Sequence, residues 1–158
     1  MSNTTFTINK ASVYNEVAKT TSYSGVKKVA DGSLYDQIFT TDEDRLLLER
    51  FWNEASNAAT ELFKPFLVSV STAAQAHGVD LSQNYVVVLA LSSAFDTSLE
   101  DSIQSSLFSF FTNFLVSRWF KFANKDEAEG FAEEAAAMLE DVKSKIYYRK
   151  KPTRVAPN

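Results

Sequence analysis

The clearest hydrophobic pattern in the chain lies between residues 44 and 66. Apolar side chains recur there every three or four residues, the spacing that places them on one face of an α-helix. Thr41 and the acids at 42–44 precede the pattern, as expected for a capping hydroxyl and for carboxylates at the positive end of the helix dipole. Pro65 lacks a backbone donor, so we expect a kink or break near residues 61–64. The apolar positions are Leu47, Leu48, Phe51, Trp52, Ala55, Ala58, Ala59, Leu62, Phe63 and Phe66.

Shorter patterns follow this helix and precede it. A helical segment over residues 70–77 is expected to end at Gly78. Residues 85–91, YVVVLAL, are β-branched and apolar on both faces, which favours a buried strand, although a helix also fits so short a run. Residues 1–9 predict a polar, extended arm.

A short helix is expected after this arm. Asn9 or Ser12 can cap it, and it should end near Thr20. Its apolar face comprises Val13, Val17 and Ala18. Residues 20–33 are rich in Ser, Thr, Lys and Gly, so they predict a loop.

A strongly aromatic helix is predicted after residues 96–98 and should continue to about Ala123. Phe108 and Phe120 fall outside its apolar stripe. A helix that is apolar on more than one side is either central in the fold or meets another subunit. The stripe comprises Ile103, Leu107, Phe110, Phe111, Phe114, Leu115, Trp119 and Phe122.

The last predicted helix opens with a capping-box pattern at residues 124–127. Its core face comprises Phe131, Ala135, Met138, Leu139, Val142 and Ile146. Its other face carries Glu129, Glu133, Glu134, Glu140 and Asp141, most simply a solvated surface. After Tyr148 the sequence RKKPTRVAPN is basic and contains two prolines, so we expect an extended segment that is poorly ordered unless a partner holds it.

These elements predict a mainly α fold: a small helical bundle with one short apolar strand or extended segment and with extended N- and C-terminal arms. Its 158 residues, 45% of them hydrophobic, fit one globular domain, which we assign to residues 1–146. Residues 147–158 form the basic tail. The absence of cysteine excludes disulfides and thiolate metal sites.

Charge is divided unevenly along the chain. The net charge is -4, but six of the sixteen basic residues follow Asp141, and no acid does. Residues 1–142 therefore carry ten basic and twenty acidic residues, a charge of about -10. An acidic body precedes a basic tail.

The sequence has no signature of export or of a membrane span. The N-terminus lacks a basic stretch followed by an apolar run, and the apolar stretch at 85–91 is far shorter than the roughly 20 residues of a membrane-spanning helix. We expect a soluble product made in the cytoplasm, with no membrane partner.

Catalytic and cofactor patterns are missing. His77, the one histidine, precedes Gly78 and is better explained as a charge at a helix end than as a catalytic base, because no Gly-x-Ser-x-Gly nucleophile motif accompanies it. The acids at 42–44 splay around a helix and lack the spacing of an EF-hand. No phosphate-binding glycine loop occurs. We therefore expect no enzyme, no cofactor and no metal.

Two groups of residues remain as candidate contact sites. The tail residues Tyr147, Tyr148, Arg149, Lys150, Lys151 and Arg154 fit a solvated terminus, a nucleic-acid arm or a docking peptide for a neighbouring subunit. An acidic body argues against ordinary DNA binding, because it repels phosphates. The aromatic residues Phe108, Phe111, Phe114, Trp119 and Phe120 are candidates for core and subunit contacts.

The order of these features resembles the head-tail connector, or adaptor, ring proteins of tailed bacteriophages. The resemblance rests on a short helix at residues 13–18, a loop, a helix begun by acids at 41–52, and the aromatic stretch 107–122 ending in Val-Ser-Arg-Trp-Phe. The apolar run 85–91 and the length of the loop 20–33 depart from typical members.

This resemblance implies a structural role. About twelve copies would form a ring beneath the portal protein, extending the DNA channel toward the next tail or connector ring in the virion. The tail would reach the portal or the next ring, and DNA would pass without specific binding, which an acidic body favours. The alternatives are a cytoplasmic helical module that regulates a protein partner and a nucleic-acid-binding protein.

Overall fold

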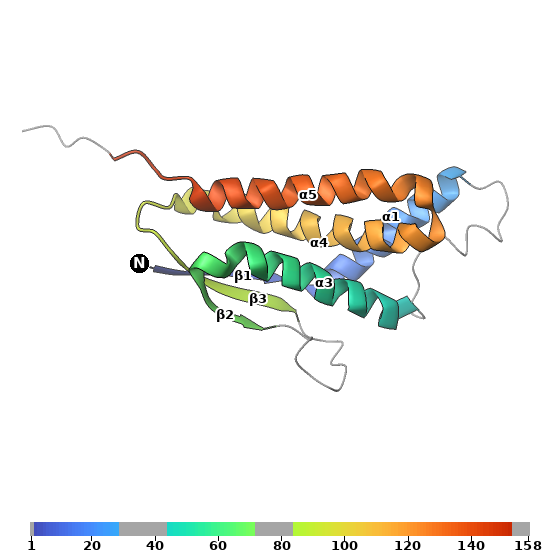
Figure 1. The fold of residues 1–158 in the computed structure, drawn as a ribbon, viewed down its shortest axis with the longest axis horizontal. Helices are drawn as coiled ribbons and strands as arrows, with labels where there is room; N and C mark the ends of the chain where they lie inside the picture. Colours follow the sequence, from blue (N-terminus) through green and yellow to red (C-terminus); the bar gives the residue numbers. More distant parts are fainter. Residues whose placement is uncertain (1, 29–43, 72–83, 153–158) are drawn as a thin grey trace, which may run out of the picture.

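The computed structural model describes residues 2–28, 44–71 and 84–152, which form a mainly helical fold with a small sheet (Figure 1). Three long helices, α3, α4 and α5, run along the longest axis of the molecule, and the sheet lies against one end of α3. The elements are β1 (Ser2–Ile8), α1 (Lys10–Lys28), α3 (Arg45–Phe63), η2 (Lys64–Phe66), β2 (Leu67–Ser71), β3 (Tyr85–Leu91), η4 (Thr97–Leu99), α4 (Glu100–Ala123) and α5 (Lys125–Tyr147).

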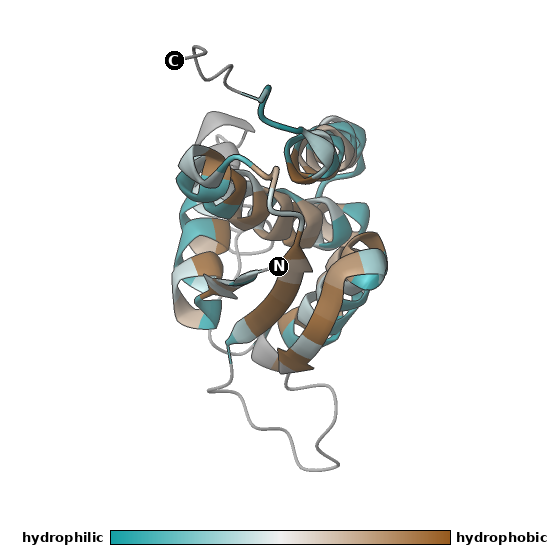
Figure 2. Cartoon of the chain, turned by 90° about the vertical axis from the view of Figure 1, so that its left-hand side faces the viewer, coloured by the Kyte–Doolittle hydropathy of each residue, from teal (hydrophilic) through white to brown (hydrophobic). Residues whose placement is uncertain are grey.

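The predicted strand at 85–91 is confirmed as β3, and it is the central strand of an antiparallel sheet with the order β1-β3-β2. Its burial alternates: Val87 and Leu89 are buried, while Val86 and Val88 are half-buried. The sheet therefore has one face in the core and the other turned outward, rather than being buried on both sides. The apolar residues of β3 form a continuous hydrophobic band in Figure 2.

The N-terminal arm is extended, as predicted, but it is part of the domain rather than a free polar segment. It forms β1, in which Phe6 pairs with Val87 and Ile8 pairs with Tyr85. Phe6 and Ile8 are both buried. Alternating threonines made the segment look polar, but the same alternation places its apolar residues on the core face of the sheet.

Helix α1 begins as predicted and continues further than predicted. The Asn9 side chain accepts a hydrogen bond from the backbone N–H of Ser12 at 2.8 Å, which caps the helix. A loop was predicted over residues 20–33, but residues 20–28 are helical and α1 ends at Lys28. Thr21 is buried and its hydroxyl donates to the carbonyl oxygen of Val17 at 2.9 Å, so this polar residue is satisfied inside the helix. The remainder, 29–33, lies outside the described residues.

The predicted break at Pro65 is confirmed. Helix α3 ends at Phe63, and the proline lies in the 3-10 turn η2. The helical segment predicted from Val70 is wrong at its start, because Val70 belongs to β2. His77 and Gly78 lie outside the described residues.

The predicted helix starts agree with the structure more closely than the predicted capping hydrogen bonds do. Asp96 accepts a hydrogen bond from the backbone N–H of Ser98 at 3.1 Å, just before α4. Asn124 precedes α5 as predicted, but its side chain makes no capping hydrogen bond, so the reciprocal capping box is not formed. Asp44 occupies the corresponding position before α3, also without such a bond. Thr41, Asp42 and Glu43 lie outside the described residues.

The aromatic helix α4 is the centre of the fold and contacts α1, α3, α5 and β1. The Phe111 ring lies 4.8 Å from that of Trp52 and 5.2 Å from that of Tyr85, measured between centroids. The assignment of two phenylalanines was wrong: Phe120 is fully buried, with its ring 5.5 Å from that of Phe131, and Phe122 is 72% exposed. Helix α5 covers the side of α4 on which Phe120 lies, which sequence periodicity alone cannot show.

We predict that Phe120→Ala lowers the free energy of unfolding by about 3 to 5 kcal/mol, because it leaves a cavity in a closed part of the core. The matched variant Phe122→Ala removes the same atoms from a ring that is mostly solvated, so its effect should stay below about 1 kcal/mol. Urea denaturation of both variants measures the difference. Equal losses would contradict this description of the core.

Candidate functional site

The predicted tail is attached to the body at its root. Arg149 forms an isolated antiparallel bridge with Phe95, and the backbone N–H of Lys150 donates to the carbonyl oxygen of Ala94 at 2.8 Å. The Arg149 guanidinium donates to the carbonyl oxygen of Ile146 at 2.9 Å, at the end of α5. These bonds fix the direction in which the chain leaves the body, so the root is ordered without a partner.

Residues 148–152 extend away from the helices (Figure 1). The side chains of Tyr148, Arg149, Lys150 and Lys151 are exposed. The nearby Asp96 carboxyl has a pKa below its ordinary value, mainly because Ser98 donates hydrogen bonds to it and to a smaller extent because of the positive charge of Lys150. Arg154 lies outside the described residues. The described part thus presents a cationic and aromatic surface.

Tyr147 lies at the junction between the tail and the bundle. It is the last residue of α5, its side chain is 47% exposed, and its ring lies 5.3 Å from that of Phe66 in η2. Leu67 and Val68, which follow Phe66, are also exposed. This end of the molecule therefore combines exposed apolar side chains with the basic tail.

The aromatic candidates on α4 divide into two groups. Phe111, Trp119 and Phe120 are buried in the core of the chain. Phe108 and Phe114 are only partly buried and pack against that core from outside. Of the five, Phe114 lines a surface hollow, together with Phe110 and Ala58. Of the residues expected at core and subunit contacts, Phe111, Trp119 and Phe120 thus lie in the core of their own chain.

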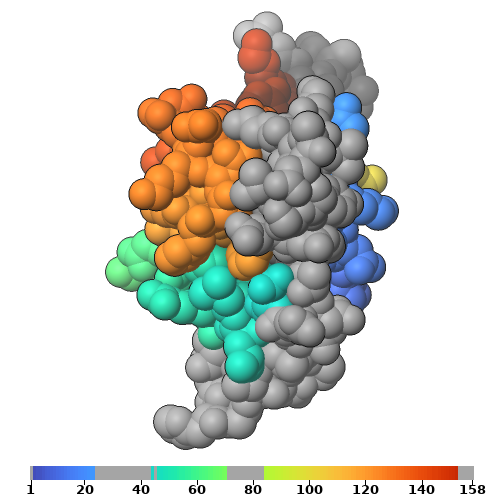
Figure 3. Space-filling view, turned by 90° about the vertical axis from the view of Figure 1, so that its right-hand side faces the viewer, coloured from blue at the N-terminus to red at the C-terminus, as the bar shows by residue number. Residues whose placement is uncertain are grey.

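A groove between α3 and α5 was not anticipated from the sequence, and α4 forms its floor. Three adjoining hollows of about 520, 290 and 480 Å³ make up the groove. Lys121 and Ala132 line both the first and the second, and Ala58 and Leu139 line both the second and the third. The alanines of α5 were the available signal, since helices with small side chains leave room above their neighbours. Figure 3 shows the end of the molecule where α5 lies above the start of α3.

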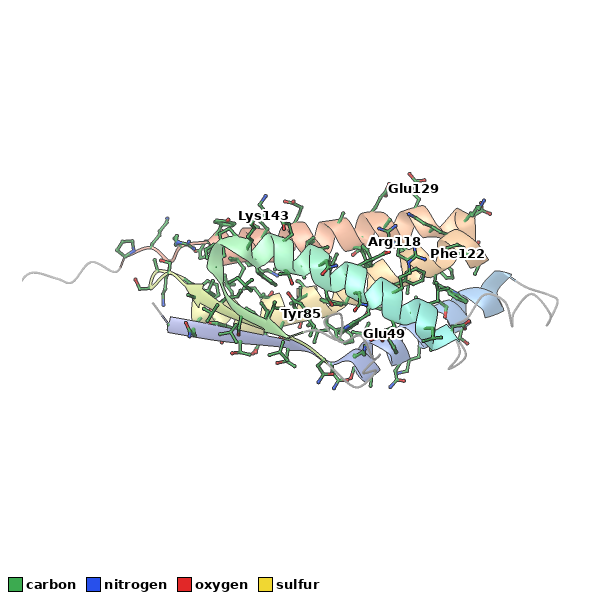
Figure 4. The ribbon with its side chains drawn as sticks, turned by 60° about the horizontal axis from the view of Figure 1, so that its bottom comes forward. Glu49, Tyr85, Arg118, Phe122, Glu129 and Lys143 are labelled. Carbon is green, nitrogen blue, oxygen red and sulfur yellow. The ribbon has the colours of Figure 1, made fainter. Side chains whose placement is uncertain are left out.

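Charged residues border this apolar groove (Figure 4). Arg118 lines it from α4, with its guanidinium 4.8 Å from the centroid of the Phe114 ring and 3.4 Å from the Glu54 carboxylate on α3. Such a stacked, paired arginine is held in place. Glu129 and Lys143 lie farther along α5 in opposite directions from its middle. The groove therefore has an apolar centre with charge at its edges.

A buried ion pair joins the N-terminal part to α3, and sequence reasoning missed it. Lys10 and Glu49 are paired with side-chain exposures of 2% and 7%. The Tyr14 hydroxyl donates to the other carboxylate oxygen of Glu49 at 2.6 Å, and the Lys10 ammonium lies 5.8 Å from the centroid of the Trp52 ring. Neither residue was distinguishable by sequence from a solvated charge. The enclosure of the pair suits a structural link better than a reaction site.

Tyr85 is a second buried polar residue in the interior. Its hydroxyl lies 3.1 Å from that of Thr60. Burial raises the pKa of Tyr85 to about 12, and the Thr60 hydrogen bond offsets only part of this rise. The phenol is therefore a hydrogen-bonding core residue at neutral pH.

Within residues 2–28, 44–71 and 84–152 no group of three or more His, Asp or Glu side chains is placed to hold a metal ion. No helix in these ranges is long and apolar enough to cross a membrane. No protein-family model matches the chain, and the search of curated proteins and of solved structures produced no match either.

We predict that Lys10→Met destabilises the fold by about 3 to 5 kcal/mol, because the Glu49 carboxylate is left buried without its counter-ion. Adding Glu49→Leu to that variant removes the stranded charge and should recover a large part of the loss. Chemical denaturation of the two single variants and the double variant measures this coupling. Additive losses would show that the two residues do not act as a pair.

A second prediction concerns alkaline pH. The folded chain holds the Tyr85 proton up to about pH 12, whereas an unfolded tyrosine loses it near pH 10, so stability should fall as pH rises between these values. Tyr85→Phe should remove this part of the pH dependence. Denaturation at several pH values, with ultraviolet titration of the phenols, tests it. An unchanged slope in the variant would contradict the assignment.

Proposed function

We propose that this protein is a structural assembly subunit, and specifically a head-tail connector ring subunit of a tailed bacteriophage. It would be made in the bacterial cytoplasm and built into the virion beneath the portal, with copies of itself beside it and the next tail or connector ring below. In this proposal it carries out no catalysis, and DNA passes through the ring without specific binding.

The observation that carries the proposal is the anchored tail. A bridge at Arg149 and a backbone bond from Lys150 orient a segment whose side chains are exposed and basic. A subunit that must find a partner in one orientation gains from such a segment a positioned contact with a small ordering cost. The charge of about -10 on residues 1–142 gives neighbouring copies a complementary surface for a basic tail.

The body also fits a DNA channel. Phosphates that bound tightly to the channel wall would slow transit, and a wall with negative charge avoids such contacts. Exposed acids on α5 contribute to this charge, among them Asp126, Glu133 and Glu134. Contacts that are repeated from head to tail close into a ring when the rotation between copies permits.

A helical protein-binding module is the second candidate, and the groove between α3 and α5 favours it. Its apolar floor at Phe110 and Phe114 is the kind of surface that accepts an amphipathic helix. This function would appear as a monomer or dimer in a 1:1 complex with a partner protein.

The test is electron microscopy of the purified protein with the portal protein encoded in the same genome. We expect rings bound to portals. Lys151→Glu, which reverses an exposed charge beyond the anchored root, should reduce portal binding at least tenfold. The control Lys64→Glu reverses an exposed charge on η2 and should have little effect. Monomers that bind no portal would overturn the proposal, and so would equal effects of the two variants.

A further inference from the structure

The groove side of α5 carries a ridge of exposed residues: Glu129, Ala132, Ala136, Glu140 and Lys143. These residues are spaced three or four apart, so they follow one side of the helix. Two methyl side chains lie near the middle of the ridge, with an acid at its end toward the N-terminus of α5 and a base at its end toward the C-terminus. Such a ridge offers close approach at its centre and opposite charge at its ends.

The charged side chains of this ridge form no salt bridge within the described residues. Neither Glu129 nor Lys143 has a salt-bridge partner among residues 2–28, 44–71 and 84–152, whereas the neighbouring groove residues Arg118 and Lys64 pair with Glu54 and Glu61. Ala132 and Ala136 are exposed as well, although both face the apolar groove. The ridge therefore has unused charge next to uncovered apolar surface.

The spacing of the charges indicates which molecule can bind to this ridge. Glu129 and Lys143 are each seven residues from Ala136, which is two turns or about 10.5 Å along a helix axis. A second α5 laid antiparallel across Ala136 places its Lys143 against Glu129 and its Glu129 against Lys143. A parallel copy would oppose like charges instead. Glu129 and Lys143 are thus complementary to each other in one orientation, in which Glu140 comes opposite Ala132 of the second copy.

We propose that two copies of this protein associate through α5, antiparallel about a two-fold axis near Ala136, each helix lying in the groove between α3 and α5 of the other copy. Alanines at the crossing allow the helix axes to approach to about 8 Å, close to the minimum for packed helices. The apolar floor at Phe110 and Phe114 is covered by the partner. The contact is isologous, because the same residues serve both copies.

This contact goes beyond the connector role and does not depend on it. A two-fold contact pairs free subunits before assembly or joins two rings, whereas neighbours within a ring meet through different surfaces. The exposed tail residues 148–152 lie beyond the end of α5, so pairing leaves them accessible. Failure of the pairing would therefore leave the portal-binding test unaffected, and the converse also holds.

The first test uses the absence of cysteine in the natural chain. In Ala136→Cys the two thiols face each other across the axis, within the span of a disulfide. Mild oxidation of the full-length variant should convert most of it into a cross-linked dimer. The control Ala137→Cys is also exposed but lies about 100° around the helix, so it should cross-link several-fold less. Equal cross-linking of the two variants would overturn the proposal.

The second test exchanges the charges and measures dimer dissociation by analytical ultracentrifugation. Glu129→Lys and Lys143→Glu each oppose like charges at two places, and each should weaken the dimer about tenfold. The double variant restores both pairs in the reverse sense and should regain most of the affinity. Glu134→Lys, on the same helix but about 160° around it from Ala136, should not change it. A monomeric natural protein, or a double variant weaker than both single variants, would contradict the antiparallel register.

Discussion

The structure depends on the enclosure of α4 by its own chain. This helix is apolar around most of its circumference, and burying it requires α3, α5, α1 and the core face of the sheet at once. The burial of rings such as Phe111 and Phe120 supplies several kcal/mol apiece, enough to fix how the surrounding elements are arranged. The N-terminal strand is part of this enclosure, which explains why a segment of polar appearance is ordered.

Enclosing α4 determines which surfaces remain for other molecules. Most aromatic side chains of α4 are buried in the core. The groove beside α5 and the tail are therefore the surfaces that remain for contacts with neighbours. The two differ physically. The groove is apolar with charged ends and suits a helix, whereas the tail is extended and cationic, and it is oriented by its bonds to the segment before η4. One chain thus offers two independent kinds of contact.

The sequence was informative wherever a local rule decides the outcome. The strand at 85–91, the break at Pro65 and the Asn9 cap follow from residue type and spacing, and all three are present. The class of fold, mainly α with a short strand, was also predictable. The pairing of β1 with β3 was not, because residues some 80 positions apart meet through hydrogen bonds that carry no sequence signature. The same holds for Lys10 and Glu49, whose burial depends on where α1 and α3 meet.

Hydrogen-deuterium exchange of the free and the assembled protein distinguishes an internal α4 from an interfacial one. If α4 is internal and contacts use other surfaces, residues 107–120 exchange slowly already in the free protein, with no further change on assembly, and new protection appears in residues 128–143 or 148–152. Rapid exchange of 107–120 in the free protein that slows on assembly would contradict an internal α4, because it would make the aromatic helix an interface rather than the core.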